Sequence, residues 1–186
     1  IAEQALHLIE VEYEPLPAVI DPQKAADPTA TLVHESWESY RAPANLARKG
    51  NVVNNAELKV GDVEKGFQEA DQIFAGRYEV AMAHQGYIEP HVAVAKVDPD
   101  GKIHVWTTTQ GQFTIRNALA EALQISHSRI RLIGTEIGSG FGGKNARVLE
   151  QPAVLLSRKT GKPVKMIMDR EEELLERPAV RARERR

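Results

Sequence analysis

The feature that most constrains how this chain folds is a concentration of glycines in its second half. Five of the 13 glycines fall within Gly134–Gly143. Apolar patterning predicts a strand at residues 129–135 before this stretch and a helix at residues 146–159 after it. Glycine adopts positive φ readily, so the backbone N–H groups of such a loop are able to converge on an anion or approach a flat ligand. The succession predicts a cradle for a bound group, with a tight turn as the plain alternative.

The spacing of these glycines narrows the class of ligand. Gly138, Gly140 and Gly143 match the spacing of a dinucleotide-binding fingerprint. That motif also needs an acidic residue about 20 positions further on to hold the ribose, whereas residues 158–161 are Arg-Lys-Thr-Gly. A nicotinamide dinucleotide is therefore disfavoured. The helix expected after the loop would add N–H donors and a dipole that favours phosphate.

The remaining pattern predicts an α+β fold with a mixed sheet. Asp98-Pro99-Asp100-Gly101 is a strong turn signal between two extended segments, which indicates an antiparallel hairpin and argues against a purely parallel sheet. Together with the strand, glycine loop and helix unit, the predicted elements are strands at 73–81, 91–97, 102–109 and 164–168 and helices at 113–123 and 171–175.

The first 55 residues have a different organisation. Residues 1–8 have a helical pattern and residues 9–13 a strand pattern, but a lone strand has nothing to pair with. Residues 1–20 are therefore expected to be the tail of a preceding domain. Residues 21–55 show no sustained period and are expected to be a linker. A second unit over residues 56–186 would follow, in a chain whose two ends suggest a segment of a longer protein.

Composition excludes several functions. The chain has no cysteine, so it provides no disulfide, thiolate nucleophile, zinc knuckle or iron–sulfur ligand of its own. Its formal charge of -2 gives no basic field for nucleic acid. It has neither an apolar run long enough to span a bilayer nor the pattern of a signal peptide, so we expect a soluble protein, with the cytoplasm as its default location.

Two uncharged side chains are candidates for a functional site. Gln110 follows the strand at 102–109, where a rigid scaffold would hold its amide and let it donate a hydrogen bond without exchanging a proton. A helix-capping or solvent-exposed amide is the alternative. Phe141 stands between paired glycines, so its ring either faces a ligand or folds back into the core.

His84, Glu89 and His91 are side chains of the kinds that bind metals. The spacing from His84 to His91 is not a recognised ligand pattern, however, and no third histidine or cysteine is near. Partly buried polar residues with ordinary partners are therefore expected, and no metal ligand is predicted.

Three segments resemble the large subunit of the molybdenum hydroxylases, the family of xanthine dehydrogenase and aldehyde oxidase. They are Met82–Pro90, Trp106–Gln110 and Gly138–Lys144, and their order and spacing agree as well as their residues. The opening residues 9–17 resemble the end of the a/b hammerhead domain of this family. Residues 56–186 would then be the N-terminal part of its molybdopterin-binding domain.

The resemblance assigns roles to individual residues. Gln110 is similar to the glutamine beside the apical ligand of the metal, and Phe141 is similar to the residue near the metal centre, so both are expected at the catalytic centre. Gln110, Gly140, Phe141, Gly142 and Gly143 would bind the cofactor. Ser139 stands where the family usually has glycine. Asn145 stands where purine-oxidising members have a glutamate, which argues against xanthine as the substrate.

The resemblance implies that the chain is part of a molybdopterin-dependent oxidoreductase and contributes part of its cofactor site. Its substrate would be an aldehyde, an N-heterocycle, carbon monoxide or an aromatic CoA thioester. In the family a catalytic glutamate and most pterin contacts lie beyond the position of Arg186, and iron–sulfur clusters and FAD are carried by other domains or subunits. The partners would be those modules and the rest of the large subunit, and the isolated segment is expected to be inactive. The alternatives are a stand-alone phosphate- or nucleotide-binding module and a non-catalytic subunit-interaction domain.

Overall fold

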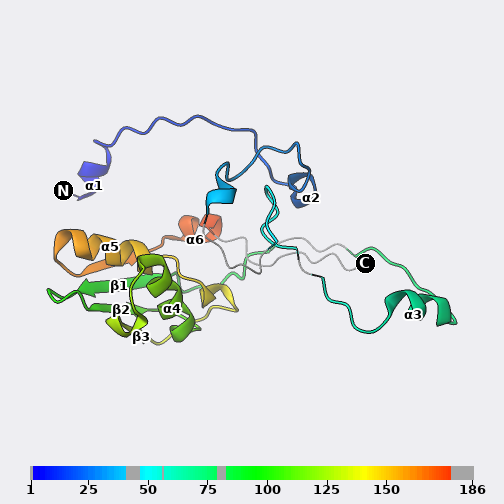
Figure 1. The fold of residues 1–186 in the computed structure, drawn as a ribbon. Coiled ribbons are helices and arrows are strands. Elements are labelled where there is room, and N and C mark those ends of the chain that lie inside the picture. Colours follow the sequence, from blue (N-terminus) through cyan, green and yellow to red (C-terminus); the bar gives the residue numbers. More distant parts are fainter. Residues whose placement is uncertain (1, 41–46, 56, 79–82, 177–186) are drawn as a thin grey trace. The chain divides into compact units, whose positions relative to one another are not determined.

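A computed structural model describes residues 2–40, 47–55, 57–78 and 83–176 of the chain. The chain divides into two compact units, Ile1–Ile73 and Phe74–Arg186. The four-stranded sheet lies in the second unit. Figure 1 shows the course of the chain through both units.

The first unit consists of short helices joined by long connections. The helices are α1 (Ala2–Leu6), α2 (Pro22–Ala25), the 3-10 turn Trp37–Ser39 and α3 (Val63–Glu69). The Asp62 side chain accepts a hydrogen bond of 3.0 Å from the Lys65 backbone N–H, which confirms that Asp62 caps α3. The strand predicted at residues 9–13 is wrong, because these residues have no ladder partner within the described part of the chain.

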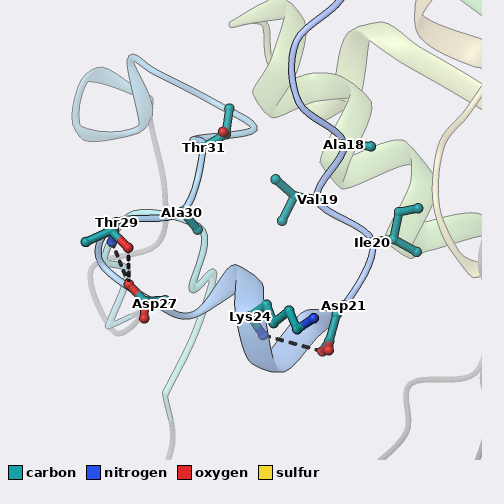
Figure 2. A pocket seen from close by; sticks show the side chains of 9 residues that line it. All are labelled: Ala18, Val19, Ile20, Asp21, Lys24, Asp27, Thr29, Ala30 and Thr31. Atoms are coloured by element: carbon teal, nitrogen blue, oxygen red, sulfur yellow. Dashed lines mark hydrogen bonds between the residues drawn. The ribbon is translucent and has the colours of Figure 1, made fainter.

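A hollow of about 560 Å³ lies beside α2 and holds three charged side chains. Figure 2 shows that Asp21 and Asp27 are turned toward their own backbone. Asp21 Oδ1 accepts from the Gln23 backbone N–H at 2.8 Å, and Asp27 Oδ1 accepts from the Thr29 N–H and hydroxyl at 2.8 and 2.6 Å. The hydrogen bonds from Thr29 lower the pKa of Asp27 below its ordinary value. Both carboxylates therefore stabilise local turns.

The second unit has a mixed sheet, as predicted. Its strands are β1 (Val92–Val97), β2 (Ile103–Thr107), β3 (Ile130–Gly134) and β4 (Val164–Ile167), in the order β3-β2-β1-β4. β1 pairs antiparallel with β2 and with β4, whereas β2 and β3 are parallel. The turn at Asp98–Gly101 closes the predicted hairpin: the Gly101 N–H donates to the Asp98 carbonyl at 2.8 Å, and Gly101 has φ +81°.

Two helices cover one face of this sheet. They are α4 (Gln112–Leu123) and α5 (Glu150–Thr160), and the 3-10 turn His127–Arg129 leads from α4 toward β3 (Figure 1). Alternate residues of the strands point at these helices and form the core with them: Ala95, Ile103, Val105, Leu119, Ala120, Ile130, Ala153 and Val154. Within the described ranges, no helix is both long and apolar enough to cross a membrane.

Two predicted boundaries need correction. Residues 73–78 form no strand, and the rest of that predicted strand, 79–81, lies outside the described residues. The helix expected from residue 146 begins at Glu150. Glu150 is buried, and its carboxylate accepts from the Thr107 hydroxyl at 2.7 Å and from the Val148 N–H at 2.8 Å. These contacts fix the start of the helix on the sheet, several residues after the glycines.

Candidate functional site

The topology brings four chain segments to one edge of the sheet. β2 and β3 are parallel, so their C-terminal ends lie together, with Thr107 opposite Gly134. β1 is antiparallel to β2 and begins at this edge, while β4 is antiparallel to β1 and ends there. The segments just before β1 and just after the other three strands therefore meet. They contain the residues singled out from the sequence.

The glycine loop, defined here as Gly138–Lys144, follows β3 and ends in the 3-10 turn Gly143–Asn145. Phe141 and Gly142 both have left-handed backbone conformations, with φ of +46° and +88°. The Phe141 side chain is 73% exposed, so its ring does not fold into the core. A left-handed phenylalanine is rare, which indicates that the surrounding contacts impose this backbone.

Gln110 lies against the glycine loop. Its Oε1 accepts hydrogen bonds from the backbone N–H groups of Gly142 at 2.9 Å and Lys144 at 3.3 Å. Its own backbone N–H donates to the Lys144 carbonyl at 2.9 Å. A Cβ on Gly140 would lie 2.6 Å from Gln110 Oε1, so glycine is required there for this close approach. Gln110 therefore shapes the loop directly.

Most backbone N–H groups of the loop are already used. The N–H of Gly143 donates to the Gly140 carbonyl at 2.7 Å, and those of Gly142 and Lys144 donate to Gln110. Among the described residues, the N–H groups of Gly140 and Phe141 and the Nε2 of Gln110 have no acceptor. We expected a helix N-terminus directly after the loop, but α5 starts only at Glu150. The loop therefore offers a ligand fewer free N–H donors than its number of glycines suggests.

The glycine loop packs on an ion pair that the sequence did not reveal, between a buried lysine and a half-buried glutamate. Lys144 is 1% exposed, and its Nζ lies 2.5 Å from Glu89 Oε2 and 5.3 Å from the centre of the Tyr87 ring. Glu89 Oε2 also accepts from the Gly138 N–H at 2.8 Å. Burial acts to raise the pKa of Glu89, but the hydrogen bonds from Lys144 and Gly138 outweigh it, so the pKa lies below its ordinary value.

A second buried group connects the site to α6 (Arg170–Glu176). Glu173 is 1% exposed, and its carboxylate accepts from the Tyr87 hydroxyl, from the His91 backbone N–H at 2.8 Å and from His91 Nδ1 at 2.5 Å. Arg170 on the same helix donates to the Tyr87 carbonyl at 2.9 Å. These donors satisfy the buried carboxylate and hold α6 against the segment before β1.

His84, Glu89 and His91 do not converge on a shared point. His91 is bound to Glu173 and Glu89 to Lys144, while His84 Nδ1 accepts from the Gly86 N–H at 3.0 Å. Across the described ranges, no group of three or more His, Cys, Asp or Glu side chains is placed to hold a metal ion. Met82, which belongs to the same resembling segment, lies outside the described residues.

Glu173 gives the stability of the chain a pH dependence with a definite sign. Burial acts to raise the pKa of Glu173, but the donors from Tyr87 and His91 leave it below the ordinary value of 4.5. The carboxylate therefore contributes stability that is fully present above that value and is lost as pH falls through the lowered pKa. The unfolding free energy of wild type should fall as the solution is acidified, and that of Glu173→Gln should fall less steeply. The two slopes should differ by up to about 1.4 kcal/mol per pH unit. Urea denaturation at a series of pH values measures the slope, with Glu172→Gln as control.

Most of the chain matches a known protein family. Residues 45–184 match a family described as the molybdopterin cofactor-binding domain. Among curated proteins, the xanthine dehydrogenase molybdenum-binding subunit of Escherichia coli O157:H7 is 31% identical over 173 residues, which are 92% of this chain and 21% of that protein. The carbon monoxide dehydrogenase large chain of Afipia carboxidovorans is 33% identical over 94% of this chain and 22% of its own length.

Solved structures show the same fold. The reconstituted CO dehydrogenase from Oligotropha carboxidovorans has a TM-score of 0.74 and 32% identity, over 92% of this chain and 22% of that one. Quinoline 2-oxidoreductase from Pseudomonas putida has a TM-score of 0.67 and 30% identity, over 92% of this chain and 21% of that one.

The extent of the match defines what is established. This chain spans about a fifth of the length of the relatives and structures that it matches. The family match covers most of the chain, including β1 to β4, Gln110 and the glycine loop. The resemblance of the three sequence segments is thereby confirmed, and the chain belongs to the family of molybdopterin cofactor-binding domains.

Proposed function

We propose that this chain supplies part of the molybdenum cofactor site of a molybdopterin-dependent oxidoreductase. One observation carries the proposal: Gln110 is hydrogen-bonded to the glycine loop at the edge of the sheet. Within that loop, the exposed Phe141 is held in a left-handed conformation. The substrate class would be an aldehyde, an N-heterocycle, carbon monoxide or an aromatic CoA thioester. Asn145 is exposed at the end of the loop and offers no carboxylate to a purine.

The residues present fit a flat anionic cofactor. The N–H groups of Gly140 and Phe141 are consecutive donors without an acceptor among the described residues, and a Cβ on Gly142 would meet nothing within 4 Å. Adjacent backbone donors of this kind suit an oxyanion or a pterin edge. We propose Gly140, Phe141 and Gly142 as cofactor-binding residues. Gly143 would contribute because its lack of a Cβ lets the Tyr87 ring lie close to the loop.

Gln110 and Phe141 would act at the reacting centre. Gln110 Oε1 is used by the loop, which leaves Nε2 as a neutral donor that holds its proton throughout. The exposed Phe141 ring would restrict access and exclude water next to that donor. The bound molybdenum cofactor supplies the redox chemistry that no side chain of this chain provides.

The rest of the assembly is part of the proposal. We infer that residues 1–20 end a preceding hammerhead-type domain, that residues 21–55 link it to the next, and that residues 56–186 begin the cofactor-binding domain. The remaining pterin contacts and the catalytic base would come from the rest of the large subunit. Iron–sulfur clusters and FAD would be held by other domains or subunits, because this chain has no cysteine to ligate iron. A cytoplasmic location remains a prediction.

The alternative of a stand-alone phosphate-binding module draws on the glycine loop alone. It is weakened because no helix begins directly after the loop, so the N-terminal donors that such modules use are missing. A subunit-interaction domain could bury the exposed ring of Phe141, but it would give no reason for the two adjacent free N–H groups of Gly140 and Phe141 in the described part of the chain. Both alternatives predict that the full-length protein purifies without molybdenum.

Elemental analysis and pterin fluorescence of the full-length protein, purified with its partner subunits, test the proposal. We expect molybdenum and pterin in equal amounts, approaching one per large subunit. The isolated 186-residue chain should oxidise neither aldehydes nor N-heterocycles in a dye-linked assay. Full-length protein that lacks both molybdenum and pterin would contradict the proposal.

Gln110→Glu in the full-length enzyme distinguishes the role of the Gln110 Oε1 acceptor from that of the Nε2 donor. The new carboxylate keeps an oxygen for the Gly142 and Lys144 N–H groups but loses the Nε2 donor. Turnover should fall by about 10²–10³, as for other oriented donors, while the molybdenum content falls much less. Gln112→Glu, on the exposed start of α4, is the control. Unchanged turnover at full molybdenum loading would remove Gln110 from the catalytic centre.

A further inference from the structure

We propose that Glu89 and Lys144 form a clasp that closes the glycine loop and thereby positions Phe141 and Gln110 against the cofactor. They act as positioning residues, because neither contacts the reacting centre in this arrangement. This inference rests on the proposed function and deepens it. It assigns a role to the ion pair between the buried Lys144 and the half-buried Glu89, which the cofactor site itself does not use.

The clasp acts on both ends of the loop through one atom. Glu89 Oε2 accepts from the backbone N–H of Gly138, the first residue of the loop, at 2.8 Å. The same oxygen lies 2.5 Å from the Nζ of Lys144, the last residue of the loop. The two ends are therefore tied to a single carboxylate from the segment before β1. The residues between them, including Phe141, are held as a closed turn.

Lys144 also connects the clasp to Gln110. Its backbone N–H donates to Gln110 Oε1 at 3.3 Å, and its carbonyl accepts from the Gln110 N–H at 2.9 Å and the Thr109 hydroxyl at 3.1 Å. The Lys144 side chain then reaches under the loop to Glu89. A shift of the ion pair would therefore move the loop and the Gln110 side chain together.

Stability alone is a poor reason for this pair. Transferring an ammonium group from water to a site with 1% exposure carries a large desolvation cost, and an apolar pair of similar volume is often as stable. The left-handed backbone of Phe141 is also unfavourable and persists only where surrounding contacts enforce it. A directional charge-assisted contact at the ends of the loop provides such enforcement.

Three variants of the full-length protein, purified with its partner subunits, test the clasp. Glu89→Gln leaves the buried Lys144 ammonium without its partner, and Lys144→Met leaves the half-buried Glu89 carboxylate without its partner. Glu89→Gln combined with Lys144→Met removes both charges. The readouts are melting temperature and the molybdenum and pterin content per subunit. We expect each single variant to melt lower and to lose about tenfold in cofactor content, in the range seen when supporting contacts of a metal site are removed.

The double variant separates positioning from stability. Its melting temperature should recover most of the loss, because no uncompensated charge remains. Its cofactor content should stay about tenfold low, because Gly138 and Lys144 are no longer held by one carboxylate. Recovery of cofactor together with melting temperature would reduce the pair to a stability element and overturn the proposal.

A matched control comes from the far end of β1. Lys96 Nζ lies 2.8 Å from Asp98 Oδ1, but the Lys96 side chain is 51% exposed. Lys96→Met, which removes only the exposed charge of that pair, should change neither readout. If the single clasp variants fail to fold, the double variant provides the decisive comparison. Wild-type protein without molybdenum and pterin overturns the proposed function and the clasp with it, whereas full loading of every variant overturns only the clasp.

Discussion

Gly143→Ala is expected to disturb both the fold and the cofactor site. A Cβ at this position would lie 2.5 Å from Cε1 of Tyr87, and the Tyr87 ring is 1% exposed. The ring has no room to retreat, because its hydroxyl is bound to the buried Glu173. We expect the domain to lose about 1–3 kcal/mol, as in other overpacked cores. Lowered melting temperature and lost molybdenum in the same preparation of the full-length protein are the measurements.

The neighbouring glycine provides the contrast for this prediction. A Cβ on Gly142 would meet nothing within 4 Å, but Gly142 has φ +88°. Gly142→Val should therefore lower stability only through backbone strain, about 1–3 kcal/mol, while it fills the space beside the free N–H groups. We expect cofactor retention to be lost with the fold largely intact. Full metal occupancy with a lowered melting temperature would mean that the loop is only a turn.

Glu173→Ala is expected to have the largest effect on stability. The substitution leaves the Tyr87 hydroxyl, the His91 N–H and His91 Nδ1 without their buried acceptor. Each buried donor left without an acceptor costs about 1–3 kcal/mol. Hydrogen exchange in the full-length protein should show loss of protection at the start of β1 and in α6, in addition to a lower melting temperature.

Glu172→Ala is the matched control for that variant. Glu172 is exposed on the same helix, and its carboxylate accepts only a local hydrogen bond of 2.9 Å from the Asp169 N–H. We expect a loss of about 0.5–1 kcal/mol, because Glu172 and Asp169 cap α6 reciprocally. Equal effects of the two variants would show that Glu173 stabilises the helix locally and not the contact with β1.

Local signals made much of the fold predictable. Asp98-Pro99-Asp100-Gly101 specifies its own turn, and the alternation in the segments on either side places Ala95, Ile103 and Val105 in the core. The stop signal at Gly161 also ends α5 as expected, with φ +67° at the cap. These features depend on residues within a few positions of each other. The glycine loop and Gln110 were found because their residue types are unusual where they occur.

The contacts that tie the site together were not predictable from local pattern. Glu173 binds partners 82 and 86 positions earlier, and Lys144 binds Glu89 across 55 positions. Nothing in a charged run such as Glu171-Glu172-Glu173 distinguishes the one carboxylate that turns inward. The helix start at Glu150 was misplaced for the same reason, because Thr107 on β2 fixes it. Burial of charge is decided by partners distant in sequence.

The strand ends on the side away from the cofactor site have a different role. There β1 and β2 are joined by the exposed turn around Pro99 and Asp100, and α5 returns to β4 through exposed residues 161–163. Changes in length at these connections do not alter the relative positions of the residues at the cofactor edge, because the ladders between them stay in register. A peptide tag or fluorophore for following assembly is therefore best inserted between Lys162 and Pro163, because an insertion within Asp98–Gly101 would break the hydrogen bond that closes the hairpin.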